Sequence, residues 1–84
     1  MKSAERLAAN FADVIRWHRK QQGLSQEALA ERAGLHAVYV SMVERKLRKP
    51  TVYVAALLAE ALAQPLSKLI SEAESRQRRR PTEQ

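Results

Sequence analysis

Apolar residues recur at helical spacing along most of the chain, whereas the alternation typical of a half-buried strand is absent almost everywhere. Leu7, Phe11 and Val14 repeat every three or four positions, which places them on one face of a helix. This pattern predicts a first helix over about residues 4–22, and Gly23 is a suitable stop signal for it.

Capping signals predict two shorter helices after this glycine. Ser25 is a good N-cap for a helix over about residues 26–33. Gly34 follows that helix, where glycine can adopt the left-handed backbone of a helix C-terminus at little cost. A very short turn then leads to a third helix over about residues 37–45.

Prolines mark the remaining two helices. Pro50 forces a break, and Thr51 is the next N-cap, opening a helix that runs to about residue 63. Pro65 can occupy the first turn of a fifth helix over about residues 65–75. Five helices without a strand predict an all-α domain.

The second and third helices, joined by so short a turn, suggest a helix-turn-helix, in which the second helix of the pair enters the major groove of DNA. Val40 and Val43 are expected to face the core. The outward face then carries Ala37, Val38 and Ser41, which are small or apolar and allow a close approach to the base edges. Val38 would contact a thymine methyl group. Because this outward face has no Arg, Lys or Asn, we expect weak direct readout of the bases, supplemented by recognition of DNA bending and groove width.

Composition narrows the function classes. The 84 residues make one small domain, and 15 Lys and Arg against 9 Asp and Glu give a net charge of +6, which favours nucleic acid as the partner. The chain has no cysteine, which excludes disulfides and thiolate sites, and His18 and His36 alone are too few ligands for a metal. No glycine-rich phosphate loop is present, so we expect neither enzymatic activity nor a cofactor. No uncharged run approaches the roughly 20 residues of a membrane span, so no membrane partner is expected.

The positive charge is concentrated in two segments. Residues 45–49 (RKLRK) form either a solvated loop or a phosphate-binding one, and residues 76–84 (RQRRRPTEQ) form either a solvated flexible tail or a nonspecific phosphate-binding arm. We therefore expect a helix-turn-helix DNA-binding and dimerisation domain over residues 1–75, followed by a basic tail over residues 76–84.

Residues 15–62, IRWHRKQQGLSQEALAERAGLHAVYVSMVERKLRKPTVYVAALLAEAL, resemble the Cro/repressor-type helix-turn-helix family. The matching motifs are Gly-Leu-Ser-Gln-x-x-Leu-Ala, then Ala-Gly-Leu, then Ser-x-Val-Glu-Arg, and finally a basic residue before Pro-Thr. The stretch YVSMVERKLRKPT and the short length most resemble the controller proteins of restriction–modification systems. The resemblance implies a five-helix lambda-repressor-like fold.

The resemblance also implies roles for individual residues. Arg19 and Glu44 match an ion pair that ties the first helix to the end of the third. The base-reading positions of the family correspond to Gln26, Ala37, Val38 and Ser41. The phosphate-contacting positions correspond to Gln26, His36, Tyr39, Arg45, Lys46, Arg48 and Lys49.

Three residues depart from the family pattern. His18 stands where the family usually has leucine, and we interpret it as a core histidine with a satisfied ring nitrogen. Lys46 replaces the usual glycine, and a left-handed backbone there would cost about 1–2 kcal/mol, which we expect to be tolerated because the ammonium reaches a phosphate. His36 at the N-cap of the third helix is either simply exposed or makes binding depend on pH near about 6–7.

The fourth predicted helix is apolar on most sides, since Glu60 is its only charge. A helix of this kind is usually buried on most sides. One face is expected to supply the core with Val52, Ala55, Leu58, Ala59 and Leu62. The second face and the fifth helix are expected to form a dimer interface of Tyr53, Leu57, Ala61, Leu66, Leu69 and Ile70. Trp17 is expected on the outer side of the first helix, where it either extends the dimer contact or covers the N-terminal residues.

These features predict a cytoplasmic, homodimeric transcription regulator that binds a palindromic operator in double-stranded DNA, with RNA polymerase as a candidate further partner. The alternative is an antitoxin-type interaction module that masks a partner toxin and autoregulates its operon. RNA binding ranks third, because the four aromatic residues form no recognisable stacking platform.

Overall fold

The computed structural model describes residues 2–78, and these residues form five helices and no strand. The helices are α1 (Lys2–Gln21), α2 (Gln26–Ala33), α3 (Ala37–Glu44), α4 (Val52–Ala61) and α5 (Leu66–Arg78). The all-α prediction is confirmed, and each predicted helix is present with ends that differ by a few residues at most.

Side-chain caps open two of the helices as the sequence indicates. The Ser25 hydroxyl accepts a hydrogen bond from the Ala28 amide at 3.0 Å, and the Thr51 hydroxyl accepts one from Val54 at 3.1 Å. His36 stands at the N-cap of α3 without a side-chain cap bond, so α3 begins less firmly than α2 and α4.

Four helices end in the same way, with a left-handed residue that satisfies the last carbonyl groups. The left-handed residues are Gly23, Gly34, Lys46 and Ala63, with φ values of 71, 72, 67 and 57°. After α3, for example, the Lys46 amide donates to Val43 at 3.0 Å and the Leu47 amide donates to Met42 at 2.8 Å. This is the Schellman pattern of helix termination. The left-handed backbone expected at Lys46 is therefore present.

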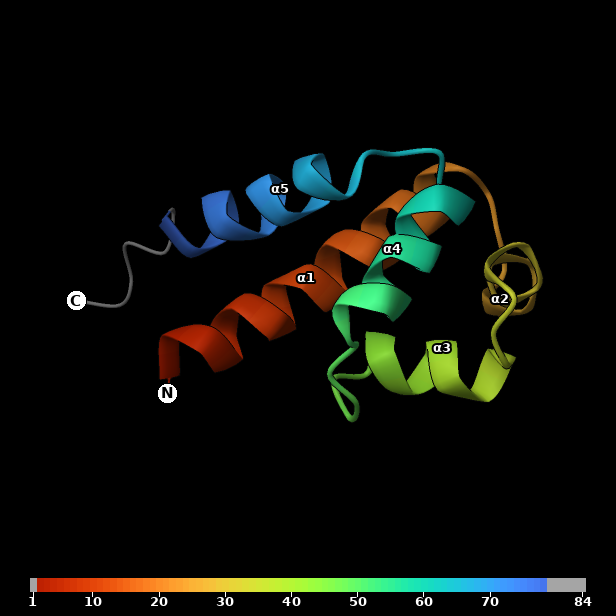
Figure 1. Cartoon of the computed structure of the whole chain (residues 1–84), viewed down its shortest axis with the longest axis horizontal. Helices are drawn as coiled ribbons and strands as arrows, with labels where there is room; N and C mark the ends of the chain where they lie inside the picture. Colours follow the sequence, from red (N-terminus) through yellow and green to blue (C-terminus); the bar gives the residue numbers. More distant parts are fainter. Residues whose placement is uncertain (1, 79–84) are drawn as a thin grey trace.

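The helices are arranged in two parts. α5 runs back along α1, so that the start of α1 and the end of α5 lie at the same end of the molecule (Figure 1). α2 lies at the other end, α3 packs against α2 and α1, and α4 packs against α2 and α5 (Figure 1). Side chains from all of these elements meet in one core, whose largest fully buried members include Ile15, Leu29, Val40, Leu58 and Leu69.

Polar side chains join the first half of α1 to the second half of α5. The Asn10 side-chain amide donates to the Ala73 carbonyl at 3.3 Å, and the Gln77 amide donates to the Ser3 carbonyl at 3.2 Å. α5 runs to residue 78, three residues beyond its predicted end, so the first residues of the predicted basic tail belong to this helix. The rest of the predicted basic tail, residues 79–84, lies outside the described residues.

His18 is buried between α1 and α5, where its Nε2 lies 2.8 Å from a carboxylate oxygen of Glu72. Trp17 is half exposed and meets the His18 ring edge-on, with the ring centroids 5.0 Å apart. The ring nitrogen of His18 is thus satisfied inside the fold, and Trp17 lies on the outer side of α1 as expected.

Two face assignments made from the sequence are wrong. Leu69, expected in a dimer interface, is completely buried in the core of its own chain. Val52, expected in the core, is 79% exposed. Helical spacing places residues on common faces, but the crossing angle of two helices decides which face meets the neighbour.

Among residues 2–78, no single helix has both the length and the apolar character to cross a membrane. Only α4 and α5 taken together satisfy that test, and they are bent by 105° at the break between them.

Candidate nucleic-acid interface

The turn between α2 and α3 fixes the angle of the third helix. Gly34 adopts the left-handed conformation, and the Leu35 amide donates back to the Ala30 carbonyl at 2.9 Å. The chain therefore reverses within three residues, and α3 packs directly on α2. This is the compact geometry that a helix-turn-helix requires.

α3 has one buried face and one free face. Val40 and Val43 are buried in the core, as predicted. Val38 points away from it and is 69% exposed. Ser41 is half-buried, and its hydroxyl accepts a hydrogen bond from Arg45 Nε at 3.2 Å.

The other sequence-assigned positions on α3 differ in exposure. Ala37 is half-buried and packs against the edge of the core, so it offers less surface than expected. Tyr39 is half-buried, and His36 is exposed at the start of the helix. The free surface of α3 is thus centred on Val38 and flanked by His36, Tyr39 and Ser41.

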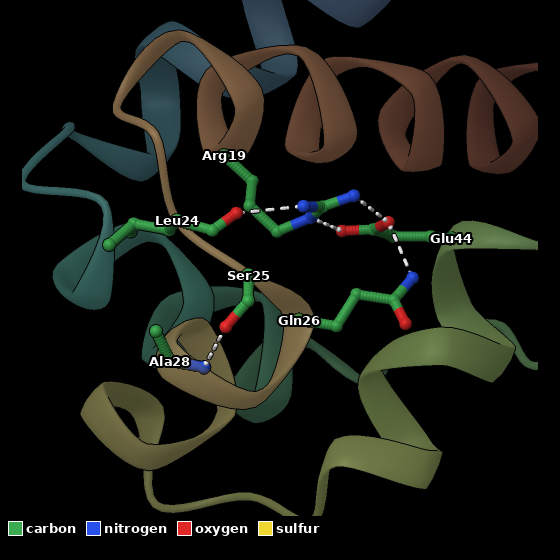
Figure 2. Close-up of polar contacts among 6 residues, drawn as sticks. All are labelled: Arg19, Leu24, Ser25, Gln26, Ala28 and Glu44. Carbon is green, nitrogen blue, oxygen red and sulfur yellow. Dashed lines mark hydrogen bonds and ion pairs between the residues drawn. The ribbon is translucent and has the colours of Figure 1, made fainter.

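A buried ion pair joins α1 to the end of α3. Arg19 Nε and Nη2 donate to the two carboxylate oxygens of Glu44 at 2.7 and 3.0 Å (Figure 2). Arg19 also donates through Nη1 to the Leu24 carbonyl at 2.8 Å, and both charged side chains are buried. The pair that the family resemblance implies is therefore present, in the bidentate geometry that is strongest for arginine and carboxylate.

Gln26 belongs to the same network. Its side-chain Nε2 donates to Glu44 Oε1 at 3.0 Å, so the first residue of α2 is held against the end of α3 (Figure 2). Gln26 also lines one cleft with Arg16, Arg19, Glu44 and Arg45. The structure thus brings Gln26 and Arg45 together, and adds Arg16, which sequence reasoning missed. Arg16 lies three residues before Arg19, and this spacing could have indicated its position, because residues i and i+3 share a helix face.

The segment after α3 carries a cluster of exposed positive charge. Arg45, Lys46, Arg48 and Lys49 are all exposed. Lys46, Arg48 and Lys49 line one cleft with Glu5 of α1. The Lys46 ammonium lies 3.0 Å from Asp13 Oδ1, so the partner found for it in the structure is this carboxylate. Sequence reasoning missed Asp13, although it is the one aspartate in the chain.

The residues expected at the dimer interface are mostly accessible, apart from Leu69. Tyr53 is 72% exposed, whereas Leu57, Ala61, Leu66 and Ile70 are half-buried at the edge of the core. Ile70 lines an apolar groove of about 220 Å³ together with Leu7 and Phe11 of α1 and with Val52 and Ala55 of α4. The apolar surface therefore extends onto α1, which the sequence pattern of α4 and α5 could not reveal.

Comparisons with known proteins agree with this geometry. The helix-turn-helix family matches residues 15–69. Control protein C.SmaI of Serratia marcescens is 43% identical over 61 residues, which cover 73% of each chain. An uncharacterized HTH-type transcriptional regulator of Mycobacterium tuberculosis (strain ATCC 25618 / H37Rv) is 41% identical over 73 residues, covering 74% of this chain and 52% of that protein.

Solved structures show the same fold. The restriction–modification controller protein C.AhdI from Aeromonas hydrophila is 38% identical, with a TM-score of 0.70 over 75% of this chain and 94% of that chain. A point mutant of the controller protein C.Esp1396I has a TM-score of 0.82 over 88% of this chain and 94% of that chain, at 23% identity. The chain therefore belongs to the helix-turn-helix family, within which it is similar to the controller proteins of restriction–modification systems.

Proposed function

We propose that the chain is a sequence-specific DNA-binding transcription regulator of the restriction–modification controller type, acting in the cytoplasm as a homodimer on a palindromic operator. The observation that supports it best is the exposed face of α3. This face presents Val38 to solvent, and the only acidic residue of α3, Glu44, is turned inward and paired with Arg19. A helix with an uncharged outer face, next to a strongly basic loop, suits the major groove.

The surrounding cations supply most of the affinity in this proposal. Arg45, Arg48 and Lys49 are exposed on the segment that leaves α3, and Arg16 joins them from α1. Gln26, His36 and Tyr39 flank α3 and are the candidate neutral phosphate contacts. Because phosphate contacts release counterions, affinity is expected to fall steeply with salt, by about 10³ or more over a fourfold increase if about 6–10 phosphates are contacted.

Specificity is expected to come from two sources. Val38 can contact a thymine methyl group in the major groove. Neither Val38 nor Ser41 can make the bidentate contacts to guanine or adenine that arginine and asparagine make, so the remaining selectivity is assigned to DNA bending and groove width. Two copies related by a two-fold axis would place their α3 helices about 34–36 Å apart, one helical turn of DNA.

Selection of bound duplexes from a random DNA pool tests this proposal. We expect recovered sequences with two inverted half-sites one turn apart. In a base-substitution series on that duplex, Val38→Ala should relax the preference for thymine at one position per half-site. Lys49→Ala is the matched contrast, because it should weaken all sequences alike and lower the slope of log affinity against log salt by about one.

The opposite pattern would contradict the proposal. A sequence-selective loss for Lys49→Ala, or unchanged specificity for Val38→Ala, would mean that α3 does not read bases. Failure of the pool to yield any enriched duplex would argue against DNA as the ligand. Co-purification of a second gene product from the native operon would then favour the antitoxin-type alternative.

A further inference from the structure

One cation of the basic loop already has a partner within the chain. Lys46 Nζ lies 3.0 Å from Asp13 Oδ1 on α1. Both side chains are partly exposed, Lys46 by 46% and Asp13 by 34%, so the pair is accessible from solvent. Arg48 and Lys49, its neighbours along the loop, make no ion pair within residues 2–78. Lys46 is therefore neutralised in the free protein, whereas the other two charges are available.

The backbone fixes this arrangement. Lys46 is the left-handed residue that ends α3, with its amide bonded to Val43 and the next amide bonded to Met42. The chain reverses at this point, and the lysine side chain returns to α1 to reach Asp13. A glycine would adopt this backbone without strain, so the lysine costs about 1–2 kcal/mol relative to glycine at this position.

Through Lys46, Asp13 contacts the cations of a cleft where DNA phosphates are expected. Lys46, Arg48 and Lys49 line the same cleft between α1 and the loop. A phosphate that approaches Arg48 and Lys49 enters beside Lys46, and it competes there with the Asp13 carboxylate for the same ammonium group. Phosphate and carboxylate both accept charge-assisted hydrogen bonds from lysine, so one can replace the other.

We propose that Asp13 competes with a DNA phosphate for the Lys46 ammonium and thereby limits how tightly the loop binds DNA. On binding, Lys46 exchanges Asp13 for a phosphate, and the Asp13 carboxylate is left to solvent. Affinity is then lower than the loop cations alone would give. This inference rests on the proposed function, and it assigns a specific cost to one contact within it.

A double-mutant cycle on the duplex recovered from the random pool tests the exchange. Asp13→Asn should tighten binding about two- to fivefold, the range that corresponds to a partly exposed ion pair. Glu5→Gln is the matched control, because it also removes one carboxylate charge, from the cleft that Lys46 lines, without breaking an ion pair; it should give less than half that gain. Asp13→Glu, which keeps the carboxylate, should bind like the original protein.

The second arm of the cycle uses Lys46→Gln. This change should lower the slope of log affinity against log salt by about 0.9, the loss of one phosphate contact. In the Lys46→Gln protein, Asp13→Asn should gain no more than Glu5→Gln does. Thermal unfolding of each variant, followed by circular dichroism, establishes that all of them are folded under the binding conditions.

Each other outcome overturns the exchange. Equal gains for Asp13→Asn and Glu5→Gln would mean that Asp13 acts only by long-range repulsion. Weaker binding of folded Asp13→Asn would mean that the pair anchors the loop and stays intact on DNA. An unchanged salt slope for Lys46→Gln would mean that Lys46 contacts no phosphate. If the original protein selects no duplex at all, the proposed function itself fails, and that result is distinct from these three.

Discussion

Single side chains hold α3 at a defined angle. Arg19 contacts both oxygens of Glu44 and the Leu24 carbonyl, and Gln26 contacts the same carboxylate (Figure 2). One buried carboxylate thus connects α1, the start of α2 and the end of α3. Because two ionised groups are removed from water here, the loss of either partner leaves a charge that nothing else in the core compensates.

Glu44→Gln tests the strength of this connection. The variant keeps the size of the side chain but leaves the Arg19 guanidinium buried without a counter-charge, so we expect a loss of about 3–5 kcal/mol in the free energy of unfolding. Urea denaturation without DNA measures it. Glu60→Gln is the control, because Glu60 is the exposed acid of α4 and its substitution should change stability by less than about 0.5 kcal/mol. Equal effects of the two changes would show that the Arg19–Glu44 pair contributes nothing specific.

The two ion pairs of α3 and the loop after it differ in how far the sequence predicts them. The Arg19–Glu44 pair was inferred from the family motif, and its burial follows from the fold. The Lys46–Asp13 pair could not be inferred, because it joins residues 33 positions apart through a left-handed backbone that the family pattern assigns to glycine. The half-burial of Ala37 is likewise set by the tilt of α3 against the core, which periodicity does not specify.

At the scale of the helices, local signals predicted the elements well and their ends less well. Ser25, Thr51 and Gly34 bracket their helices as the sequence indicates, because capping is a local interaction. α5 runs beyond its predicted end because Gln77 bonds to the Ser3 carbonyl of α1, a contact between residues far apart in sequence. Local helix propensity does not predict a contact between residues so far apart in sequence.

The shared mode of helix termination allows a direct test. Ala63 ends α4 in the left-handed conformation, with φ of 57°. Ala63→Gly should stabilise the protein by about 0.5–1 kcal/mol, because it removes about 1–2 kcal/mol of left-handed strain while the glycine adds about 0.4–1 kcal/mol of unfolded-state entropy. The same substitution at Ala56, inside α4, should destabilise by about 1 kcal/mol. Urea denaturation midpoints that move in the same direction for both variants would contradict the assignment.

At the scale of the whole molecule, the α1–α5 pair extends beyond the family-matched region in both directions. The family match covers residues 15–69, whereas Ser3 and Asn10 on one side and Ala73 and Gln77 on the other lie outside it and contact each other. These contacts widen the apolar surface around Ile70 by adding Leu7 and Phe11 from α1. A domain of this size has a thin core, so a second copy on this surface would add burial that one chain cannot supply.

The proposed dimer can be separated from DNA binding with two matched substitutions. Tyr53 is 72% exposed and Val38 is 69% exposed. Each residue lies in the first turn of its helix, where a glutamate is compatible with the helix dipole. Tyr53→Glu should raise the dimer dissociation constant about tenfold or more, because it places a charge where an aromatic anchor is expected. Val38→Glu should leave the dimer intact and abolish operator binding by repulsion from the DNA.

Sedimentation equilibrium without DNA measures the dimer in both variants, so charge effects on DNA affinity do not enter. Loss of dimer in Val38→Glu as well as in Tyr53→Glu would place the contact elsewhere or indicate general damage to the fold. If both variants remain fully dimeric, Tyr53 is outside the interface, and the apolar groove around Ile70 becomes the surface to substitute next. With the expected result, folded Tyr53→Glu would still bind a single half-site weakly, since α3 and the basic loop of each copy are unchanged, and its preference for two half-sites one turn apart would disappear.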